Sequence, residues 1–313
     1  MNDSPAMLRL LERFHLARII CLGDLMLDRY VYGTVERISA EAPIPIIRDE
    51  RNESVLGGVG NVARNIAAAG GQAHLLALNG DDAAGAEVAA QLAAMAGAGA
   101  GISTDLVTRP GRPTTVKTRY IAAGQQLLRA DRETTDAINT ADGETLLSHL
   151  DAALTGAEVL VLSDYGKGVL SDDLLAAAIA RARAANVTTV ADPKRHDLSA
   201  YGGVDFLKPN RAELTAATGL PCDSDEQVTR AARAVMQQCD IGAILVSRSE
   251  QGMSLITKDG DPVHLPVRAP EVFDVSGAGD TVVAIFALAL AAGSAPMLGA
   301  QLANLAGAIV VGK

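Results

Sequence analysis

The sequence predicts an α/β fold with a mostly parallel central sheet, helices on both of its faces, and a small β-sheet attached. Short apolar stretches suited to buried strands alternate with helical stretches along most of the chain. Each of these strands ends in polar loop residues, which is typical of parallel sheets with a ligand site at the carboxyl ends of the strands. Two segments, 29–51 and 112–132, break the alternation.

The elements of the central sheet can be assigned in chain order. A buried strand ends at Gly23-Asp24, a small-residue helix follows in GNVARNIAAAGG, and the next strand is AHLLALNG. Later strands lie in EVLVLSDYGKG, NVTTVADPK, VDFLKPN and GAILVSRSEQG, with helical stretches between them. The alternation favours one sheet with helices on both faces.

The two exceptional segments are rich in β-formers and charge, and they contain no intervening helix. We expect them to form hairpins that meet in a small sheet, the lid. The predicted division is a core of residues 1–28, 52–111 and 133–313, with a lid of residues 29–51 and 112–132 inserted in it.

Composition limits the classes of function. The net charge of −10 argues against nucleic acid or an anionic membrane as the main partner, so an anionic ligand requires a local basic cluster. Three widely spaced cysteines do not suggest a disulfide framework and favour a reducing, cytoplasmic location. The N-terminus resembles no signal peptide, and the histidines lack zinc-ligand spacing.

The stretch VSGAGDTVVA, residues 275–284, places glycines and an acid before an apolar helix. We expect these residues to form a turn that leads into a helix at about Thr281, and the exposed amides of Gly277, Ala278 and Gly279 at this helix start suit a phosphate group. Asp280 at that point can accept a proton from an attacking hydroxyl while the amides stabilise the transferred phosphoryl group. The alternative is that Asp280 only caps its helix.

Two further motifs have equally plain alternatives. In KPNRAEL, Asn210 and Glu213 suit magnesium bound through water, or simply a capping box. In GGVGNVARN, residues 57–65, the pattern Gly58, Gly60, Ala63 imitates a dinucleotide fingerprint. The charged segment before it does not suit the required buried strand. We therefore favour close approach of a sugar at the glycines, with Asn61 bonding a hydroxyl.

Polar residues follow the predicted strands and should meet at one edge of the sheet. Basic residues that could converge there meet the demand for a local basic cluster. The polar set is Asp24, Asp164, Lys167, Asp192, Lys194, Asn210 and Ser247, and the basic set is Arg119, Arg129, Lys167 and Lys194.

Together these motifs resemble the ribokinase (PfkB) family of sugar kinases, over nearly the whole chain and above all in DVSGAGD. The resemblance implies an αβα sandwich with a β-sheet lid, and ATP and Mg²⁺ as cosubstrate and cofactor. It makes Asp280 the catalytic base and the 277–279 amides the anion hole. The implied sugar ligands are Asp24, Gly57, Gly58 and Asn61, and the implied nucleotide and magnesium ligands are Asn210, Glu213, Ser247, Gly252 and Asn304.

Within the family, GDLMLDRYVYGTVERISAEAPIPI, LSDYGKG, RSEQGMSL and AGAIVVGK resemble the D-glycero-β-D-manno-heptose-7-phosphate kinases. These phosphorylate the anomeric hydroxyl with ATP on the route to ADP-heptose and lipopolysaccharide. A kinase of fructose 6-phosphate or tagatose 6-phosphate, a nicotinamide-dependent oxidoreductase and a sugar-phosphate sensor are the alternatives.

The resemblance also bears on ions and partners. Family members continue beyond this chain's last residue, Lys313, and residues there help to bind a monovalent cation beside Asp274, so K⁺ is an open expectation. Heptose kinases often carry a fused nucleotidylyltransferase domain that this sequence lacks, so we expect phosphorylation only. Unpaired lid strands and the apolar APIPII predict a homodimer through the lid.

Overall fold

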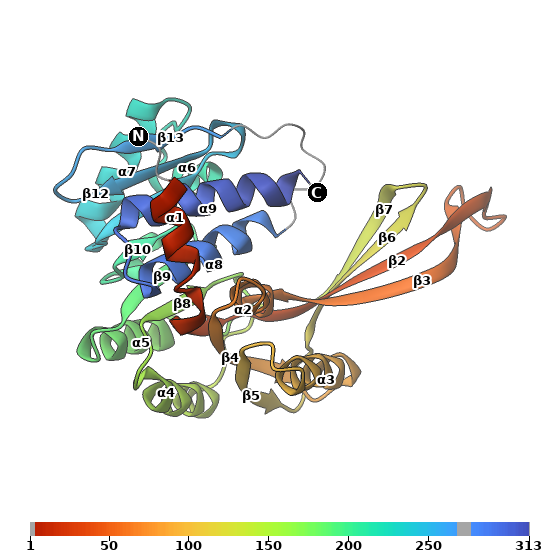
Figure 1. Cartoon of the computed structure of the whole chain (residues 1–313). Coiled ribbons are helices and arrows are strands. Elements are labelled where there is room, and N and C mark those ends of the chain that lie inside the picture. The colour runs from red at the N-terminus through yellow and green to blue at the C-terminus, as the bar shows by residue number, and fades with distance from the viewer. Residues whose placement is uncertain (1–3, 268–276, 313) are drawn as a thin grey trace.

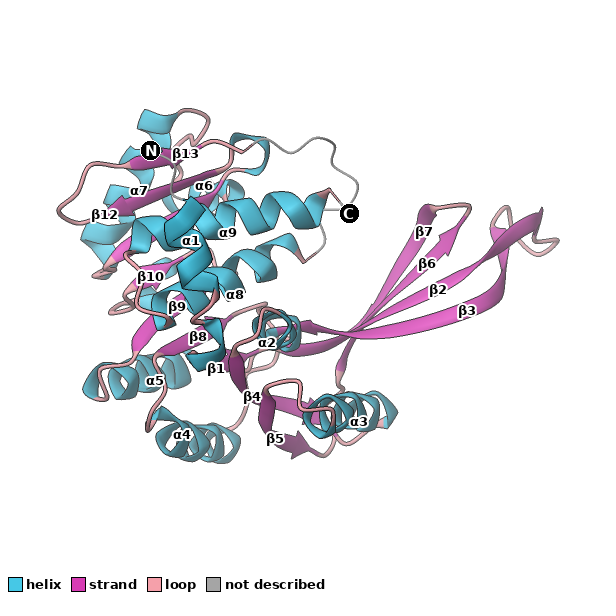
Figure 2. Ribbon diagram, viewed as in Figure 1, coloured by secondary structure: helices cyan, strands magenta, loops and turns pink. Residues whose placement is uncertain are grey.

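The computed structural model describes residues 4–267 and 277–312. Figure 1 shows a layered α/β body from which a long, narrow sheet projects, and Figure 2 shows that this projection contains strands and loops only. The predicted fold class, an αβα sandwich with a mostly parallel sheet and a smaller second sheet, is confirmed.

The large sheet has the order β13-β12-β11-β10-β9-β8-β1-β4-β5 within the described residues. Neighbours from β11 to β5 are parallel, whereas β12 and β13 are antiparallel additions at one edge. Its strands are β1 (Arg18–Gly23), β4 (Gln72–Gly80), β5 (Ile102–Arg109), β8 (Val159–Ser163), β9 (Thr188–Asp192), β10 (Phe206–Leu207), β11 (Ala243–Ser247), β12 (Met253–Thr257) and β13 (Val263–Leu265).

Alternate residues of the central strands enter two separate cores because successive side chains of a strand point to opposite faces. Ile19 and Cys21 of β1 pack in one core, and Ile20 and Leu22 pack in the other. The first core is covered by α1 (Ser4–Leu11), α2 (Val59–Ala68), α3 (Ala83–Gly97), α8 (Ala278–Ala291) and α9 (Pro296–Val311). The second is covered by α4 (Thr140–Leu154), α5 (Asp172–Ala184), α6 (Arg211–Thr218) and α7 (Asp225–Cys239).

The projecting sheet has the order β3-β2-β6-β7, and we call it the small sheet. Each hairpin is antiparallel, and the two hairpins join through the parallel pair β2 and β6. Its strands are β2 (Leu25–Ile38), β3 (Pro45–Gly58), β6 (Thr115–Ala122) and β7 (Gln125–Arg132). The predicted lid segments fall within this sheet and its turns, although β2 and β3 extend further toward the body.

Two details differ from the sequence-based expectation. Helix α8 begins at Ala278, whereas a start near Thr281 was expected, so the glycine-rich turn forms part of its first turn. Strands β5, β12 and β13, which lie at the two ends of the large sheet, were not predicted. Among the described helices, none combines the length and apolar character needed to cross a bilayer.

Candidate active site

A pocket of about 280 Å³ lies where the small sheet joins the body of the molecule. All four strands of the small sheet, α2, the loop after β8 and the start of α8 contribute to it. Its lining includes Asp28, Tyr30, Gly58, Asn61, Arg64, Lys117, Arg119, Arg129, Tyr165, Gly277 and Asp280. Sequence segments far apart in the chain thus meet around one small, polar cavity.

Asp280 lies in the first turn of α8 and is buried. Its Oδ1 accepts a hydrogen bond from the Tyr165 hydroxyl, and its Oδ2 accepts one from Asn61 Nδ2 at 2.6 Å. Burial raises the pKa of Asp280 above its ordinary value, and the two hydrogen bonds oppose that rise. The side chain of Asp280 does not cap α8, whose N-cap residue is Gly277, so the capping interpretation is wrong. The carboxylate of Asp280 instead belongs to a residue that lines the pocket.

The start of α8 is shaped to receive an anion. Gly277 has φ = +74°, a left-handed conformation that favours glycine, and precedes the first helical amides. Amide groups at a helix start have no partner within the helix, and the helix dipole favours negative charge there. Beside the turn, a Cβ at Gly279 would lie 3.4 Å from Lys208 Nζ, so a buried ammonium group adjoins the predicted anion hole.

Lys208 also pairs with a buried carboxylate, since its Nζ lies 3.1 Å from Asp192 Oδ1. Burial raises the pKa of Asp192 to about 7, the charges of Asp280 and Glu213 add to the rise, and Lys208 opposes it. A divalent cation would relieve this repulsion, and carboxylate oxygens are the ligands that Mg²⁺ prefers. The described residues contain no cluster of three or more side chains of the metal-binding types. Asp192 and Glu213 are therefore candidates for a magnesium ion that also binds nucleotide phosphates.

Asn210 and Glu213 form the capping box of α6 in this structure. Asn210 Oδ1 accepts from the amide of Glu213 at 2.8 Å, and Glu213 Oε2 accepts from the amide of Asn210 at 2.9 Å. The capping box, which is the alternative to a magnesium site for this motif, is therefore present. The box leaves Glu213 Oε1 beside Lys194 Nζ at 3.3 Å, so the carboxylate keeps an oxygen for further contacts.

The structure corrects the assignment of Asp24 as a sugar ligand. Asp24 is fully buried, and its carboxylate accepts the backbone amides of Tyr165 at 2.8 Å, Lys167 at 3.0 Å and Val169 at 3.1 Å. Asp28, which follows it on β2, lines the pocket instead. Asp28 was missed because a buried strand followed directly by Gly23-Asp24 resembles the end of a parallel strand, where ligand residues are expected.

Four basic residues line the pocket and supply the positive charge that an anionic ligand requires. They are Arg64, Lys117, Arg119 and Arg129. Arg119 Nη1 lies 2.6 Å from Asp28 Oδ1, and Arg129 and Lys117 both pair with Asp131. Arg64 donates to the neutral Asn61 Oδ1 at 2.7 Å and forms no ion pair with the described residues. Arg64 lies within GGVGNVARN but was not singled out there, and Lys117 lies in none of the motifs recognised in the sequence.

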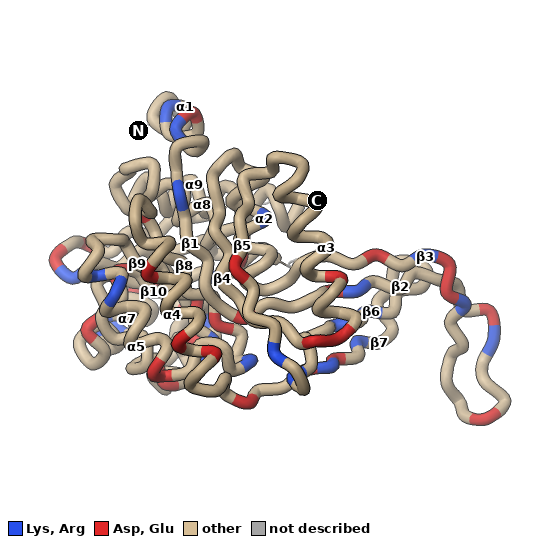
Figure 3. Tube along the Cα trace, turned by 90° about the horizontal axis from the view of Figure 1, so that it is seen from below, with Lys and Arg blue, Asp and Glu red and all other residues tan. Residues whose placement is uncertain are grey.

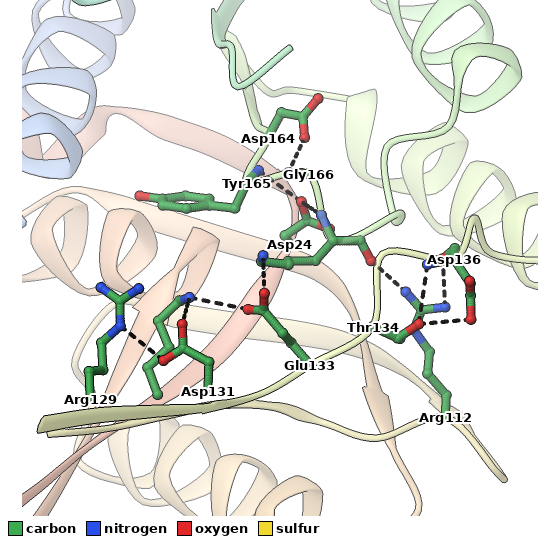
Figure 4. Close-up of polar contacts among 12 residues, drawn as sticks. Asp24, Arg112, Arg129, Asp131, Glu133, Thr134, Asp136, Asp164, Tyr165 and Gly166 are labelled. Atoms are coloured by element: carbon green, nitrogen blue, oxygen red, sulfur yellow. Dashed lines mark hydrogen bonds and ion pairs between the residues drawn. The ribbon is translucent and has the colours of Figure 1, made fainter.

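Lys167 and Lys194 do not line this pocket. Lys167 Nζ lies 2.7 Å from Glu133 Oε1 and so links the loop after β8 to the residue that follows β7. Figure 4 shows the polar contacts around Glu133. Lys194 is half-exposed and pairs with Glu213. The structure therefore does not support Lys167 as a direct ligand in the pocket, and it places Lys194 on the side of α6.

The glycines at the end of β3 are needed for close packing. Gly58 has φ = +58° and lines the pocket, and a Cβ at Gly57 would collide with the carboxylate of Asp28. Asn61 donates to Asp280 and accepts from Arg64, so its amide is already engaged. Strand β3 is exposed over much of its length, which excludes the buried first strand of a dinucleotide fingerprint.

The remaining predicted nucleotide residues lie along the neighbouring edge of the sheet. Ser247 ends β11 and forms a parallel bridge with Asn210, and Gly252 has φ = +82° before β12. Asn304 of α9 donates to the backbone oxygen of Pro266 at 3.1 Å. Asp274 lies outside the described residues.

Comparison with known proteins gives one consistent family. The model of the pfkB family carbohydrate kinases matches residues 16–313. The chain is 48% identical over 313 residues to the bifunctional protein HldE of Paramagnetospirillum magneticum, and 46% identical over 313 residues to that of Rhodospirillum rubrum. It is covered completely in both alignments but spans only 63% and 62% of those relatives.

Solved structures agree on the fold. Phosphofructokinase-2 from Escherichia coli superimposes with a TM-score of 0.78 at 23% identity, covering 94% of each chain. Ribokinase from Arabidopsis thaliana, solved with ribose and ATP, gives a TM-score of 0.73 at 21% identity over 94% of this chain and 92% of that one. Since the family model matches nearly the whole chain and the structure has the same fold, this chain belongs to the pfkB family of carbohydrate kinases.

Proposed function

We propose that this chain transfers the γ-phosphate of ATP to the anomeric hydroxyl of D-glycero-β-D-manno-heptose 7-phosphate. The products are the 1,7-bisphosphate and ADP, and the reaction serves the route to ADP-heptose and lipopolysaccharide. Residues 23–46, which resemble the heptose-7-phosphate kinases, contribute Met26, Asp28 and Tyr30 to the pocket. This stretch supports the choice of sugar because three of its residues line the pocket that we assign to the sugar.

The basic lining of the pocket is the observation that supports a phosphorylated substrate. The chain has a net charge of −10, yet Arg64, Lys117, Arg119 and Arg129 gather around a cavity of about 280 Å³. Such a cluster attracts an anion against the overall field and can bind phosphate oxygens by charge-assisted hydrogen bonds. A neutral sugar would not need it.

In the proposed reaction, Asp280 accepts the proton of the anomeric hydroxyl. The hydroxyl oxygen forms a bond to the γ-phosphorus, the bond from that phosphorus to the bridging oxygen breaks, and ADP leaves with the electron pair. The amides at the start of α8 and the ammonium group of Lys208 stabilise the charge on the transferred group. Positioning and charge stabilisation supply most of the rate, because the protein makes no covalent bond.

Asp192 and Glu213 are the residues proposed to hold magnesium, Glu213 through water. The ion, when bound, neutralises phosphate charge on the nucleotide. Asn210, Ser247, Gly252 and Asn304 are proposed to line the nucleotide, and K⁺ beside Asp274 remains a proposal.

The test is ADP release with magnesium-ATP and three acceptors: the heptose 7-phosphate, fructose 6-phosphate and tagatose 6-phosphate. We expect kcat/KM to be highest for the heptose by at least ~100-fold, because a pocket built for one sugar leaves polar groups unpaired with another. Exclusive turnover of a hexose phosphate would retain the kinase chemistry and overturn the choice of sugar.

A further inference from the structure

The loop after β8 contacts two buried carboxylates that belong to different parts of the chain, Asp24 and Asp280. Figure 4 shows Asp24 beside the backbone of Tyr165 and Gly166 in this loop. On one side, Asp24 Oδ2 accepts the backbone amide of Tyr165 at 2.8 Å. On the other, the hydroxyl of the same tyrosine donates to Asp280 Oδ1. Asp24 thus contacts Tyr165, and Tyr165 contacts the proposed proton acceptor.

Asp24 has no solvent-exposed surface and binds only backbone in this loop. Burial raises the pKa of Asp24 above its ordinary value, and the amides of Lys167, Tyr165 and Val169 oppose the rise. A buried carboxylate is costly unless it is fully hydrogen-bonded, and here three amides of one short loop supply the bonds. The arrangement fixes the backbone on both sides of Tyr165.

The Tyr165 hydroxyl acts as a donor to Asp280. Burial and the nearby charge of Asp280 raise the pKa of Tyr165, so its hydroxyl keeps the proton near neutral pH. Asn61 Nδ2 donates to the other oxygen of Asp280. Each carboxylate oxygen therefore has one protein donor and retains a lone pair for a substrate hydroxyl.

We propose that Tyr165 is a positioning residue for the proton acceptor Asp280, and that Asp24 holds Tyr165 in place for this task. The inference rests on the proposed kinase function, because it assumes that Asp280 takes the substrate proton. The Tyr165 hydroxyl holds one orientation of the carboxylate toward the pocket, which also contains the tyrosine ring. It also stabilises the ionised form that proton transfer requires.

The groups around Asp280 determine in which direction the loss of the Tyr165 hydroxyl moves the pKa of Asp280. Burial raises its pKa, Tyr165 and Asn61 lower it, Lys208 lowers it, and Asp28 raises it. The charge of Asp280 in turn raises the pKa of Asp192. Removing the Tyr165 hydroxyl removes a stabiliser of the carboxylate, so the pKa of Asp280 rises and activity is lost at a higher pH as the solution is acidified.

The experiment compares Tyr165→Phe with wild type in the pH profile of kcat/KM. We expect the acidic limb to move upward by about one pH unit and kcat at neutral pH to fall about tenfold, consistent with loss of one hydrogen bond to a charged group. The KM for ATP should stay unchanged, because Tyr165 lines the pocket assigned to the sugar and the residues proposed to line the nucleotide do not.

Tyr201→Phe is the matched control. Tyr201 is fully buried, and its hydroxyl donates to the buried Asp164 at 2.6 Å, but it does not line the pocket. Loss of that hydroxyl should lower thermal stability and leave the acidic limb in place. An equal shift in both variants would reduce Tyr165 to a structural role and overturn the proposal.

A second readout does not depend on turnover. The side-chain carboxyl carbon of Asp280, assigned by comparison with Asp280→Asn, is titrated by ¹³C NMR in wild type, Tyr165→Phe and Tyr201→Phe. An upward shift only in Tyr165→Phe supports the positioning role even if the sugar substrate has been misassigned. An unchanged titration of Asp280 in Tyr165→Phe overturns the role, whereas absence of turnover in wild type counts against the proposed function alone.

Discussion

At the scale of single residues, Arg119 contacts two partners in the pocket. Its Nη1 is 2.6 Å from Asp28 Oδ1, and its guanidinium carbon lies 5.2 Å from the centre of the Tyr30 ring. Both side chains of the ion pair are largely buried, at 15% and 17% exposure, so the pair is little screened by water. The pair holds a guanidinium group in the cavity without using all of its donors.

Arg119→Met should therefore raise the KM for the phosphorylated sugar by about 10- to 100-fold, the effect expected for one charge-assisted contact. Steady-state kinetics with varied sugar phosphate measure this. Arg51→Met is the control, because Arg51 stacks on Tyr32 at 4.1 Å and pairs with Glu53 but lies outside the pocket. Equal KM values in the two variants would contradict the assignment.

The positions of the residues that line the pocket were partly predictable. Asp280 and Gly277 could be found because a glycine turn, an acid and an apolar helix occur together in a short stretch. Asp24 and Asp28 could not be distinguished, since the sequence does not show that three loop amides converge on Asp24 while Asp28 faces the cavity. Lys208 and Tyr165 were likewise visible in motifs but gained a role only from tertiary contacts.

At the scale of elements, the small sheet leaves apolar side chains exposed. Ile38, Ile44 and Leu128 are 62%, 56% and 59% exposed, and β7 is an edge strand that is exposed throughout. Unpaired edges and exposed apolar groups favour association with a second surface. A second copy of the chain, joined through this sheet, is the partner that we predict.

Light scattering after size exclusion should give twice the chain mass of 32.3 kDa for wild type. The double variant Ile38→Asn and Ile44→Asn should give the mass of one chain, because it removes apolar contacts from the sheet. Met297→Asn in α9 alters a side chain that is 50% exposed and should leave the dimer intact. A monomeric wild type would contradict a dimer through the lid.

The elements themselves were predictable where the pattern was strong. Strands β1, β4, β8, β9 and β11 are apolar and end in polar residues, and all of them lie in the large sheet. Strands β12 and β13 were missed, because they are antiparallel additions with no intervening helix to mark them. The parallel pairing of β2 with β6 is a long-range contact that neither hairpin specifies alone.

At the scale of the whole molecule, the structure combines an acidic exterior with a local basic cluster. Figure 3 shows both signs of charge along the small sheet, and the chain has 37 acidic and 27 basic residues. The basic side chains of the pocket come from α2 and from β6 and β7, so the small sheet must be in place for the cluster to exist. The proposed recognition of the substrate phosphate thus depends on the junction of sheet and body.

The central claim is that Asp280 takes the substrate proton at the start of α8. Turnover by Asp280→Asn tests it most directly, with ATP binding and thermal midpoint measured in parallel. Since burial disfavours the charged form of Asp280, the variant should fold and bind ATP normally. We predict a loss of kcat of at least ~100-fold, as expected when a general base is removed. Turnover equal to that of wild type would contradict the claim.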